Sequence, residues 1–272
     1  MSTKRDDKVI MQKFFSGGLA GACSRTIVAP LDRIKILLQT TKRVGNMKMI
    51  FSSIIREEGV LKLWKGNALN CIRIVPYSAL QFGTYESCKQ VIMSDSSVMT
   101  IPQRLGCGTM AGLVAASFTH PIDVVRHRIM LEKSSTSVYN ISKSLVRENG
   151  LRGLFKGYGS TTVSLTPFVA VNFCAFDTMK TLSNRHETSD ILVLGAASAL
   201  ISQTICYPLD TIRRRMQMSN SGYRNGLDAF LKILRNEGVH RLYSGLSANA
   251  LKIVPNNSIR FLVYHKISES IL

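Results

Sequence analysis

Six segments of this chain are rich in apolar residues and carry few charges. They lie near residues 14–38, 71–93, 105–127, 159–180, 191–212 and 249–267. No run of 18 uninterrupted apolar residues occurs, which excludes a simple membrane anchor. The length of the segments and their sparse charges predict six helices that cross a membrane.

A shorter amphipathic segment lies between two spans and is clearest in the last third of the chain. Its apolar residues recur at helical spacing, at Leu227, Phe230, Leu231 and Leu234. Lys232 and Arg235 fall elsewhere on that helix, so we expect it to lie on a membrane surface. Cationic turns beside it suit an anionic lipid head group.

Two motifs recur three times, in step with these segments. A Pro-x-Asp-x-x-Lys/Arg motif begins at Pro30, Pro121 and Pro208, which lie 91 and 87 residues apart. An element that joins an aromatic residue to a glycine follows each copy and closes at Gly66, Gly157 and Gly245. Motifs that stay in step this way predict one pseudo-symmetric body of three units, 1–98, 99–187 and 188–272.

Each proline motif brings one acid and one base to membrane depth. Charged groups there are costly unless paired or wetted, so we expect them to face inward. Acid and base of one motif point toward different neighbours around a ring, which favours pairing between repeats over a local bridge at each helix end. The expected pairs are Asp32 with Arg126, Asp123 with Arg213 and Asp210 with Lys35. Three such pairs would form a gate around a central axis.

The second span of each repeat carries one polar stripe. Aligned on Pro76, Pro167 and Pro255, the spans give four layers of three residues: Asn70, Thr161 and Asn249; Arg73, Ser164 and Lys252; Tyr77, Phe168 and Asn256; Gln81, Asn172 and Arg260. A polar stripe on an apolar helix is typical of a wall that lines water.

Four cations converge in or beside these layers, and we expect them to be unpaired: Arg25, Arg73, Lys252 and Arg260. Unpaired cations would attract a multiply charged anion such as a phosphate ester. Ser164, Leu165 and Phe168 of the second repeat can instead hold the flat face of a base. Plain packing of Leu165 and Phe168, and snorkelling of the cations, are the alternatives.

The charge balance also indicates an anionic partner. The chain has 35 basic and 17 acidic residues, a net charge of +18 and a pI near 10.0. A basic soluble nucleic-acid binder or scaffold is the alternative, but no nucleic-acid-binding motif is visible and many basic residues lie within apolar segments. The sequence contains no nucleophile–base pair, and its six cysteines have no metal-ligand spacing. We therefore expect neither an enzyme, nor a metal, nor a cofactor.

With these motifs, the chain resembles the mitochondrial carrier family over essentially its full length. The resemblance implies an all-α membrane protein, with six transmembrane helices in a threefold pseudo-symmetric barrel and three short matrix-side amphipathic helices. It implies alternating access, with the acids and bases of the proline motifs closing a matrix gate. Gln39 and Gln217 match the glutamine braces beneath that gate, and Met130 does not.

The same resemblance implies a second gate, on the cytoplasmic side. Its aromatic–acid–base motif occurs twice, as Tyr85, Glu86 and Lys89, and as Phe176, Asp177 and Lys180. Glu86 can pair with Lys180, but the third copy, 264–268, departs from the pattern. We therefore expect the cytoplasmic gate to be the weaker one and the empty carrier to rest open to the cytoplasm.

Within the family, the chain is similar to the nucleotide-transporting branch. The similarity implies exchange of adenine nucleotides, ADP against ATP or ATP against phosphate, with coenzyme A or adenosine 3′,5′-bisphosphate as the alternative. The implied substrate-binding residues are Arg25, Arg73, Ser164, Leu165, Phe168, Asn249, Lys252 and Arg260. We expect a monomer in the inner membrane of a mitochondrion or related organelle, with an anionic lipid such as cardiolipin and no nucleic acid as partner.

Overall fold

The computed structural model describes residues 2–40, 46–93, 99–132, 137–183, 188–218, 222–253, 255–256, 259 and 263. Within these ranges, the side chains of 2–17, 182–183 and 188–192 are not considered. All regular structure in the described residues is helical, which confirms the expected all-α class.

The order long helix, short helix, long helix occurs three times along the chain. The long helices are α1 (Ser2–Thr40), α3 (Asn67–Met93), α4 (Ile101–Leu131), α6 (Tyr158–Ser183) and α7 (Thr188–Met216). A C-terminal helical segment follows, described at 246–253, 255–256, 259 and 263. The short helices are α2 (Met47–Glu57), α5 (Val138–Asn149) and α8 (Gly226–Glu237), each followed by a 3-10 helix: η1 (Val60–Trp64), η2 (Gly150–Phe155) and η3 (Val239–Tyr243).

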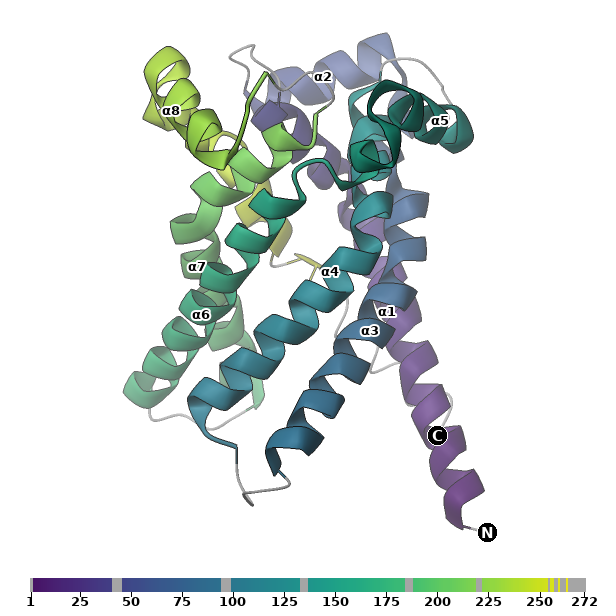
Figure 1. Cartoon of the computed structure of the whole chain (residues 1–272). Helices are drawn as coiled ribbons and strands as arrows, with labels where there is room; N and C mark the ends of the chain where they lie inside the picture. Colours follow the sequence, from purple (N-terminus) through teal and green to yellow (C-terminus); the bar gives the residue numbers. More distant parts are fainter. Residues whose placement is uncertain are drawn as a thin grey trace.

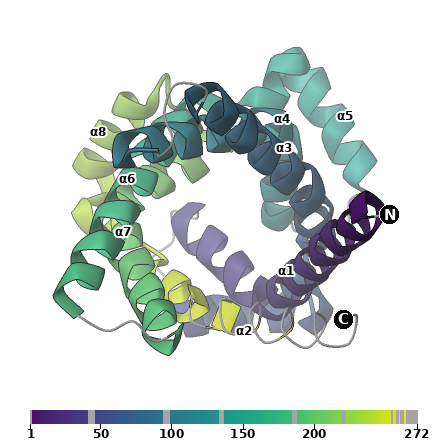
Figure 2. The same cartoon turned by 90° about the horizontal axis from the view of Figure 1, so that it is seen from below.

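The long helices stand side by side around one axis, and the short helices lie at one end of them (Figure 1). Seen along that axis, the helices form a ring, in which α3 packs against α4 and α6 against α7 (Figure 2). Helices from successive repeats are therefore neighbours, and side chains that face the axis come from all three repeats.

Each short helix is held by a small apolar cluster at its end of the molecule. Around α2 the cluster contains Ile34, Leu38, Ile54, Leu63 and Ala248. The clusters of the other repeats are Val124, Val125, Ile129, Ile141 and Leu145 around α5, and Ile212, Ala229, Ile233 and Leu242 around α8. Burying these faces fixes each short helix against the end of its own long helix.

At one glycine in each repeat, the backbone approaches another repeat closely. Gly66, Gly157 and Gly245 all have positive φ, between 74° and 87°, which favours glycine. A side chain at Gly66 would press on Met130 of α4, and one at Gly157 on Gln217 beyond α7. One at Gly245 would meet the Lys35 backbone of α1 at 3.1 Å. The third contact returns to the first repeat, so these close approaches complete the ring.

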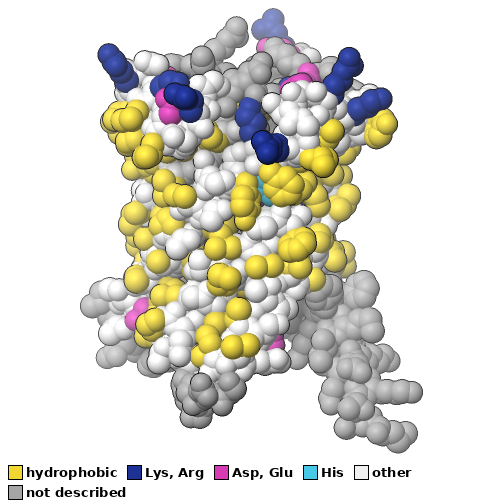
Figure 3. Space-filling view, in the orientation of Figure 1, with side chains coloured by type: hydrophobic (Ala, Val, Ile, Leu, Met, Phe, Trp, Pro, Cys, Tyr) yellow, Lys and Arg dark blue, Asp and Glu magenta, His cyan; other side chains and the backbone are white. Residues whose placement is uncertain are grey.

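The outer surface of the long helices is apolar. Large side chains that are more than half exposed include Leu19, Ile27, Ile72, Phe82, Phe118, Val163, Val193 and Ile205. Apolar side chains cover the flank in Figure 3, and Lys and Arg gather at the end with the short helices. By length and composition alone, the described residues contain one stretch suited to crossing a membrane, Val138–Thr181.

Candidate functional site

The acids and bases of the three proline motifs pair between repeats. The closest nitrogen and oxygen atoms join Asp32 with Arg126 at 3.2 Å, Asp123 with Arg213 at 3.5 Å, and Asp210 with Lys35 at 2.7 Å. The three predicted pairings are confirmed, and purely local bridges are ruled out. We call these six residues the acid–base ring. Its side chains are at most 16% exposed, so each charge depends on its partners for compensation.

Two cations of the polar stripe also bind the ring. Arg73 on α3 lies 2.9 Å from Asp123, and Lys252 of the C-terminal helical segment lies 2.7 Å from Asp32. The expectation that Arg73 and Lys252 are unpaired was therefore wrong. The register argument aligned the second spans with one another, but it did not fix their depth relative to the carboxylates of the next repeat.

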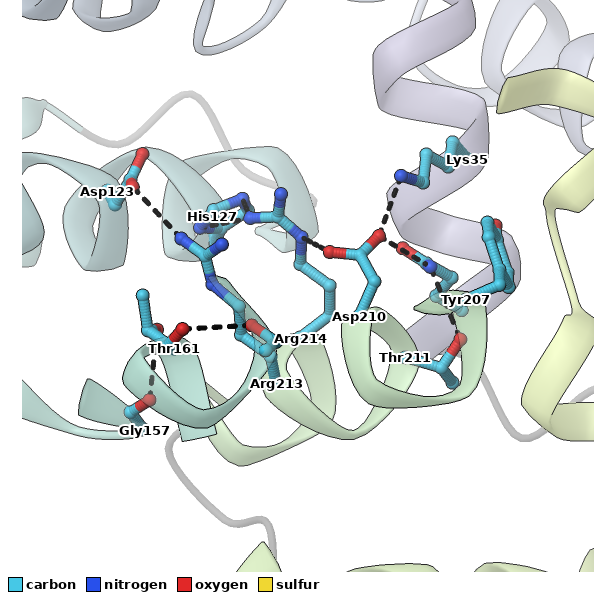
Figure 4. Close-up of polar contacts among 12 residues, drawn as sticks. Lys35, Asp123, His127, Gly157, Thr161, Tyr207, Asp210, Thr211, Arg213 and Arg214 are labelled. Carbon is cyan, nitrogen blue, oxygen red and sulfur yellow. Dashed lines mark hydrogen bonds and ion pairs between the residues drawn. The ribbon is translucent and has the colours of Figure 1, made fainter. Parts of the chain in front are cut away.

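The third carboxylate, Asp210, has a different second cation. Arg214, one turn further along α7, places its Nε 3.5 Å from the Asp210 carboxylate. Gln39 donates to the same carboxylate at 3.3 Å and to the Thr211 hydroxyl at 3.3 Å. Figure 4 shows Lys35 and Arg214 approaching Asp210 from opposite sides. Each ring acid thus has two cationic partners, and the ring with its second cations carries a net charge of +3.

The layer of the polar stripe nearest the short helices is buried. Asn70, Thr161 and Asn249 are each at most 3% exposed. Arg25 on α1 donates to the Asn70 side chain at 3.1 Å, so it also has a partner. In the next layer Ser164 is buried and donates to the Thr161 carbonyl at 2.9 Å.

The remaining predicted substrate contacts lie further from the short helices along the second spans. Leu165 and Phe168 of α6 are partly buried. Tyr77 of α3 lies under the guanidinium of Arg73, 5.3 Å from its ring centre. Arg260 falls outside the described residues.

The two predicted glutamine braces differ. Gln39 contacts the ring through Asp210, as the brace requires. Gln217 is 3% exposed, and neither its amide nitrogen nor its oxygen has a hydrogen-bond partner in the described residues. Only one of the two sequence matches therefore touches a ring acid here.

Two buried arginines link long helices to short ones, and sequence reasoning missed them. Arg33 donates to both oxygens of Glu58, at 2.9 and 2.8 Å. Arg215 binds Glu237 at 2.6 and 2.9 Å, and these bonds hold the pKa of Glu237 below its ordinary value. The repeated Glu-Gly pairs, 58–59 and 237–238, were the available signal, because a recurring partly buried acid needs a partner.

The second repeat builds this link differently. Asn149 stands where the other repeats have the acid. Arg128 instead reaches Glu148, 4.0 Å away, with side chains that are 28% and 44% exposed. A long, solvated ion pair of this kind contributes little to stability.

The aromatic–acid–base motifs lie at the other end of the long helices. Lys89 pairs with Glu86 of its own helix at 3.2 Å. Among the described residues, Asp177 and Lys180 form no ion pair, and the expected pair between Glu86 and Lys180 is not made in this conformation. Tyr85 and Phe176 are partly buried, and the third copy, 264–268, lies outside the described residues.

The described part of the chain holds no cluster of three or more His, Cys, Asp or Glu side chains able to bind a metal ion. The six cysteines are free thiols. The chemistry of the site is therefore that of a buried, positively charged cluster of ion pairs at one end of a ring of helices.

Comparison with known sequences matches the threefold pattern. The model of a family described as mitochondrial carrier protein matches residues 6–96, 97–187 and 184–272. The chain is 38% identical over 271 residues to the thylakoid ADP,ATP carrier protein, chloroplastic, of Arabidopsis thaliana. That match covers 95% of this chain and only 65% of the length of that protein.

Two further relatives are matched over most of their length. The mitochondrial adenine nucleotide transporter of Arabidopsis thaliana is 34% identical over 308 residues, covering 96% of this chain and 87% of that protein. A mitochondrial coenzyme A transporter of Mus musculus is 35% identical over 272 residues, covering 93% of this chain and 85% of that protein.

Proposed function

The chain belongs to the mitochondrial carrier family, whose members are membrane transporters and not enzymes. From this premise we propose that it is an antiporter that exchanges adenine nucleotides across the membrane of a mitochondrion or related organelle. The names of two relatives support this substrate class, and the chloroplast origin of one leaves the organelle open.

In this proposal, six helices cross the membrane: α1, α3, α4, α6, α7 and the C-terminal helical segment. Their exposed apolar side chains face lipid. The short helices α2, α5 and α8 lie on the matrix surface, and the Lys and Arg side chains at that end attract an anionic lipid such as cardiolipin. The repeats 1–98, 99–187 and 188–272 act as one integral unit, and the carrier works as a monomer.

The acid–base ring is the proposed matrix gate. Each of its pairs contributes from about 1 to several kcal/mol, depending on how much water reaches it. The aromatic–acid–base motifs are the proposed cytoplasmic gate, and the two copies that the structure describes make no ion pair with each other. These contacts support the proposal that the carrier rests open to the cytoplasm.

The ring supplies a way to couple its opening to substrate. Arg73 binds Asp123 and Lys252 binds Asp32. Phosphate oxygens of a nucleotide compete for the same two cations. When substrate binds Arg73 and Lys252, the ring acids Asp123 and Asp32 each lose one cationic partner. Substrate binding therefore lowers the free energy needed to open the gate.

The other substrate contacts follow the polar stripe. Arg25 and Asn249 stand beside the phosphates, Arg260 binds them from two layers further along the stripe, and the base rests against Ser164, Leu165 and Phe168. The observation that carries the proposal is the shared binding of Arg73 and Lys252 to ring acids of neighbouring repeats. Coenzyme A or adenosine 3′,5′-bisphosphate is the second candidate, favoured by the similarity to the coenzyme A transporter.

The test is uptake of labelled ATP into liposomes that contain the purified protein and are preloaded with ATP. We expect uptake to require internal nucleotide and to be inhibited by external ADP more than by AMP, phosphate or coenzyme A. Equal uptake into empty liposomes would contradict antiport. Strongest inhibition by coenzyme A would favour the second candidate.

A further inference from the structure

The three corners of the acid–base ring are not equivalent. Two ring acids take their second cation from the second span of another repeat, Arg73 for Asp123 and Lys252 for Asp32. At the corresponding position of the second repeat stands Ser164, whose hydroxyl is bonded to its own helix. Asp210 therefore has no second cation from α6.

Arg214 fills this place from the helix of Asp210 itself. A pair one turn apart on a single helix constrains little, since a long side chain can turn away at small cost. Arg214 is nevertheless only 17% exposed, and its Nε stays 3.5 Å from the Asp210 carboxylate. Something other than the ion pair must hold its guanidinium there.

The neighbour that holds it is His127 of α4. The Nη1 of Arg214 contacts the imidazole Nε2 of His127, and it lies 3.5 Å from Nδ1 (Figure 4). A guanidinium only donates hydrogen bonds, so the imidazole must offer a lone pair. His127 is 3% exposed, which leaves its ring little freedom to turn away.

The charges around His127 explain why a neutral acceptor suits this place. Its neighbours are the guanidinium groups of Arg73, Arg126, Arg213 and Arg214. A carboxylate here would compete with the ring acids for these cations, whereas a neutral imidazole binds Arg214 without adding a charge.

We propose that His127 is a positioning residue of the gate: it fixes Arg214 on Asp210 and keeps this corner closed by a contact that substrate does not displace. The inference rests on the proposed function, because it assigns His127 a role in strict exchange. Substrate removes cations from two corners, while the corner of Asp210 stays closed until those two have loosened. Without His127, Arg214 is free to leave Asp210, and the gate opens more often without substrate.

The experiment measures substrate-independent efflux of labelled ATP from preloaded liposomes, beside exchange. His127→Leu should raise efflux into nucleotide-free buffer roughly tenfold, the factor expected for one lost charged hydrogen bond, while exchange persists. His127→Gln keeps an acceptor and should stay within about twofold of wild type. His240→Leu is the matched control, because His240 is exposed on η3, and it should change nothing.

Arg214→Met gives an independent variant if His127→Leu does not fold. It should raise efflux as His127→Leu does, and the double variant should be no leakier than either single one. The proposal would be overturned if efflux from His127→Leu stays at the wild-type rate or if the two substitutions act additively. It would also be overturned if His127→Gln raises efflux as much as His127→Leu does.

A readout without substrate separates this inference from the proposed function. In detergent, the losses of apparent Tm caused by His127→Leu and Arg214→Met should be non-additive whatever the carrier transports. If wild-type protein exchanges none of the nucleotides and this coupling is still present, only the proposed substrate is wrong. Additive losses of apparent Tm would contradict the contact between His127 and Arg214.

Discussion

The two ends of the helix ring carry related sets of charges but use them in opposite ways. At the end with the short helices, every ring acid binds cations from other helices and is at most 16% exposed. At the other end, Lys89 binds Glu86 on its own helix, and the two side chains are 38% and 54% exposed. The first arrangement ties the repeats together, and the second leaves them independent.

This difference shows that a charged motif alone does not produce ion pairs between repeats. An ion pair that is solvated and local contributes at most about 1 kcal/mol, whereas breaking a buried pair costs about 3 to 5 kcal/mol. The conformation seen here is thus held by the acid–base ring, and variants at the two ends should differ accordingly.

The largest expected effect comes from Asp123→Asn. The change leaves Arg73 and Arg213 buried without their counter-ion, and we expect a loss of about 3 to 5 kcal/mol in stability. The control at the other end, Glu86→Gln, should cost no more than about 1 kcal/mol. Thermal unfolding of the purified proteins in detergent measures both. Equal losses in the two variants would remove the distinction between the ends.

Arg73→Ala should act chiefly on transport. Under the proposed function it removes a charged hydrogen bond to substrate phosphate, and a bond of about 3 kcal/mol corresponds to a roughly hundredfold lower exchange rate. Arg128→Ala is the matched control, since Arg128 forms a partly exposed pair with Glu148 and none with a ring acid among the described residues, and it should keep most of the activity. Normal exchange by Arg73→Ala would place the substrate elsewhere.

A smaller effect is expected where long and short helices are linked. Glu237→Gln weakens two bonds from buried Arg215 and should cost about 1.5 to 3 kcal/mol at neutral pH, while Glu148→Gln should cost less than about 1 kcal/mol.

The effect of Glu237 should also depend on pH. Because the pKa of Glu237 is lowered in the folded protein, its contribution is present above its ordinary pKa and is lost as pH falls through the folded value. Unfolding measured from neutral to acidic pH should therefore bring wild type and Glu237→Gln together. A gap that is constant over this range would contradict the assignment.

The smallest contrast is between the two glutamines. Gln39→Leu removes hydrogen bonds to Asp210 and Thr211 and should cost about 1 kcal/mol. Gln217→Leu replaces a buried amide that has no hydrogen-bond partner in the described part of the chain, so it should be neutral or slightly stabilising. Melting curves of the two variants decide this, and a larger loss for Gln217→Leu would show that its amide is used.

The sequence was sufficient for features that repeat. Three copies of the proline motif predicted the helix order and the pairing of Asp32 with Arg126 and its two equivalents, because a ring of repeats allows few other partners for buried charges. It could not predict which second cation each acid takes, because that depends on how deep the neighbouring helices stand relative to one another.

The role of His127, which sequence reasoning missed, arises where the repeats differ. Ser164 breaks the cation layer and His127 follows Arg126 without an equivalent in the other repeats, where Ile36 and Arg214 stand. Only the packing of α4 near α7 reveals that these two departures compensate each other. Pseudo-symmetry thus predicts the common framework, and its local failures have to be read from contacts.

The most direct test of the account is a charge swap across the ring. Lys35→Asp and Asp210→Lys should each abolish exchange of labelled ATP in preloaded liposomes, because each puts two like charges in place of a buried pair whose atoms lie 2.7 Å apart. The double variant, with the pair reversed, should recover a substantial part of the exchange. Single variants that transport normally, or a double variant no better than either, would contradict the claim that pairs between repeats form the gate.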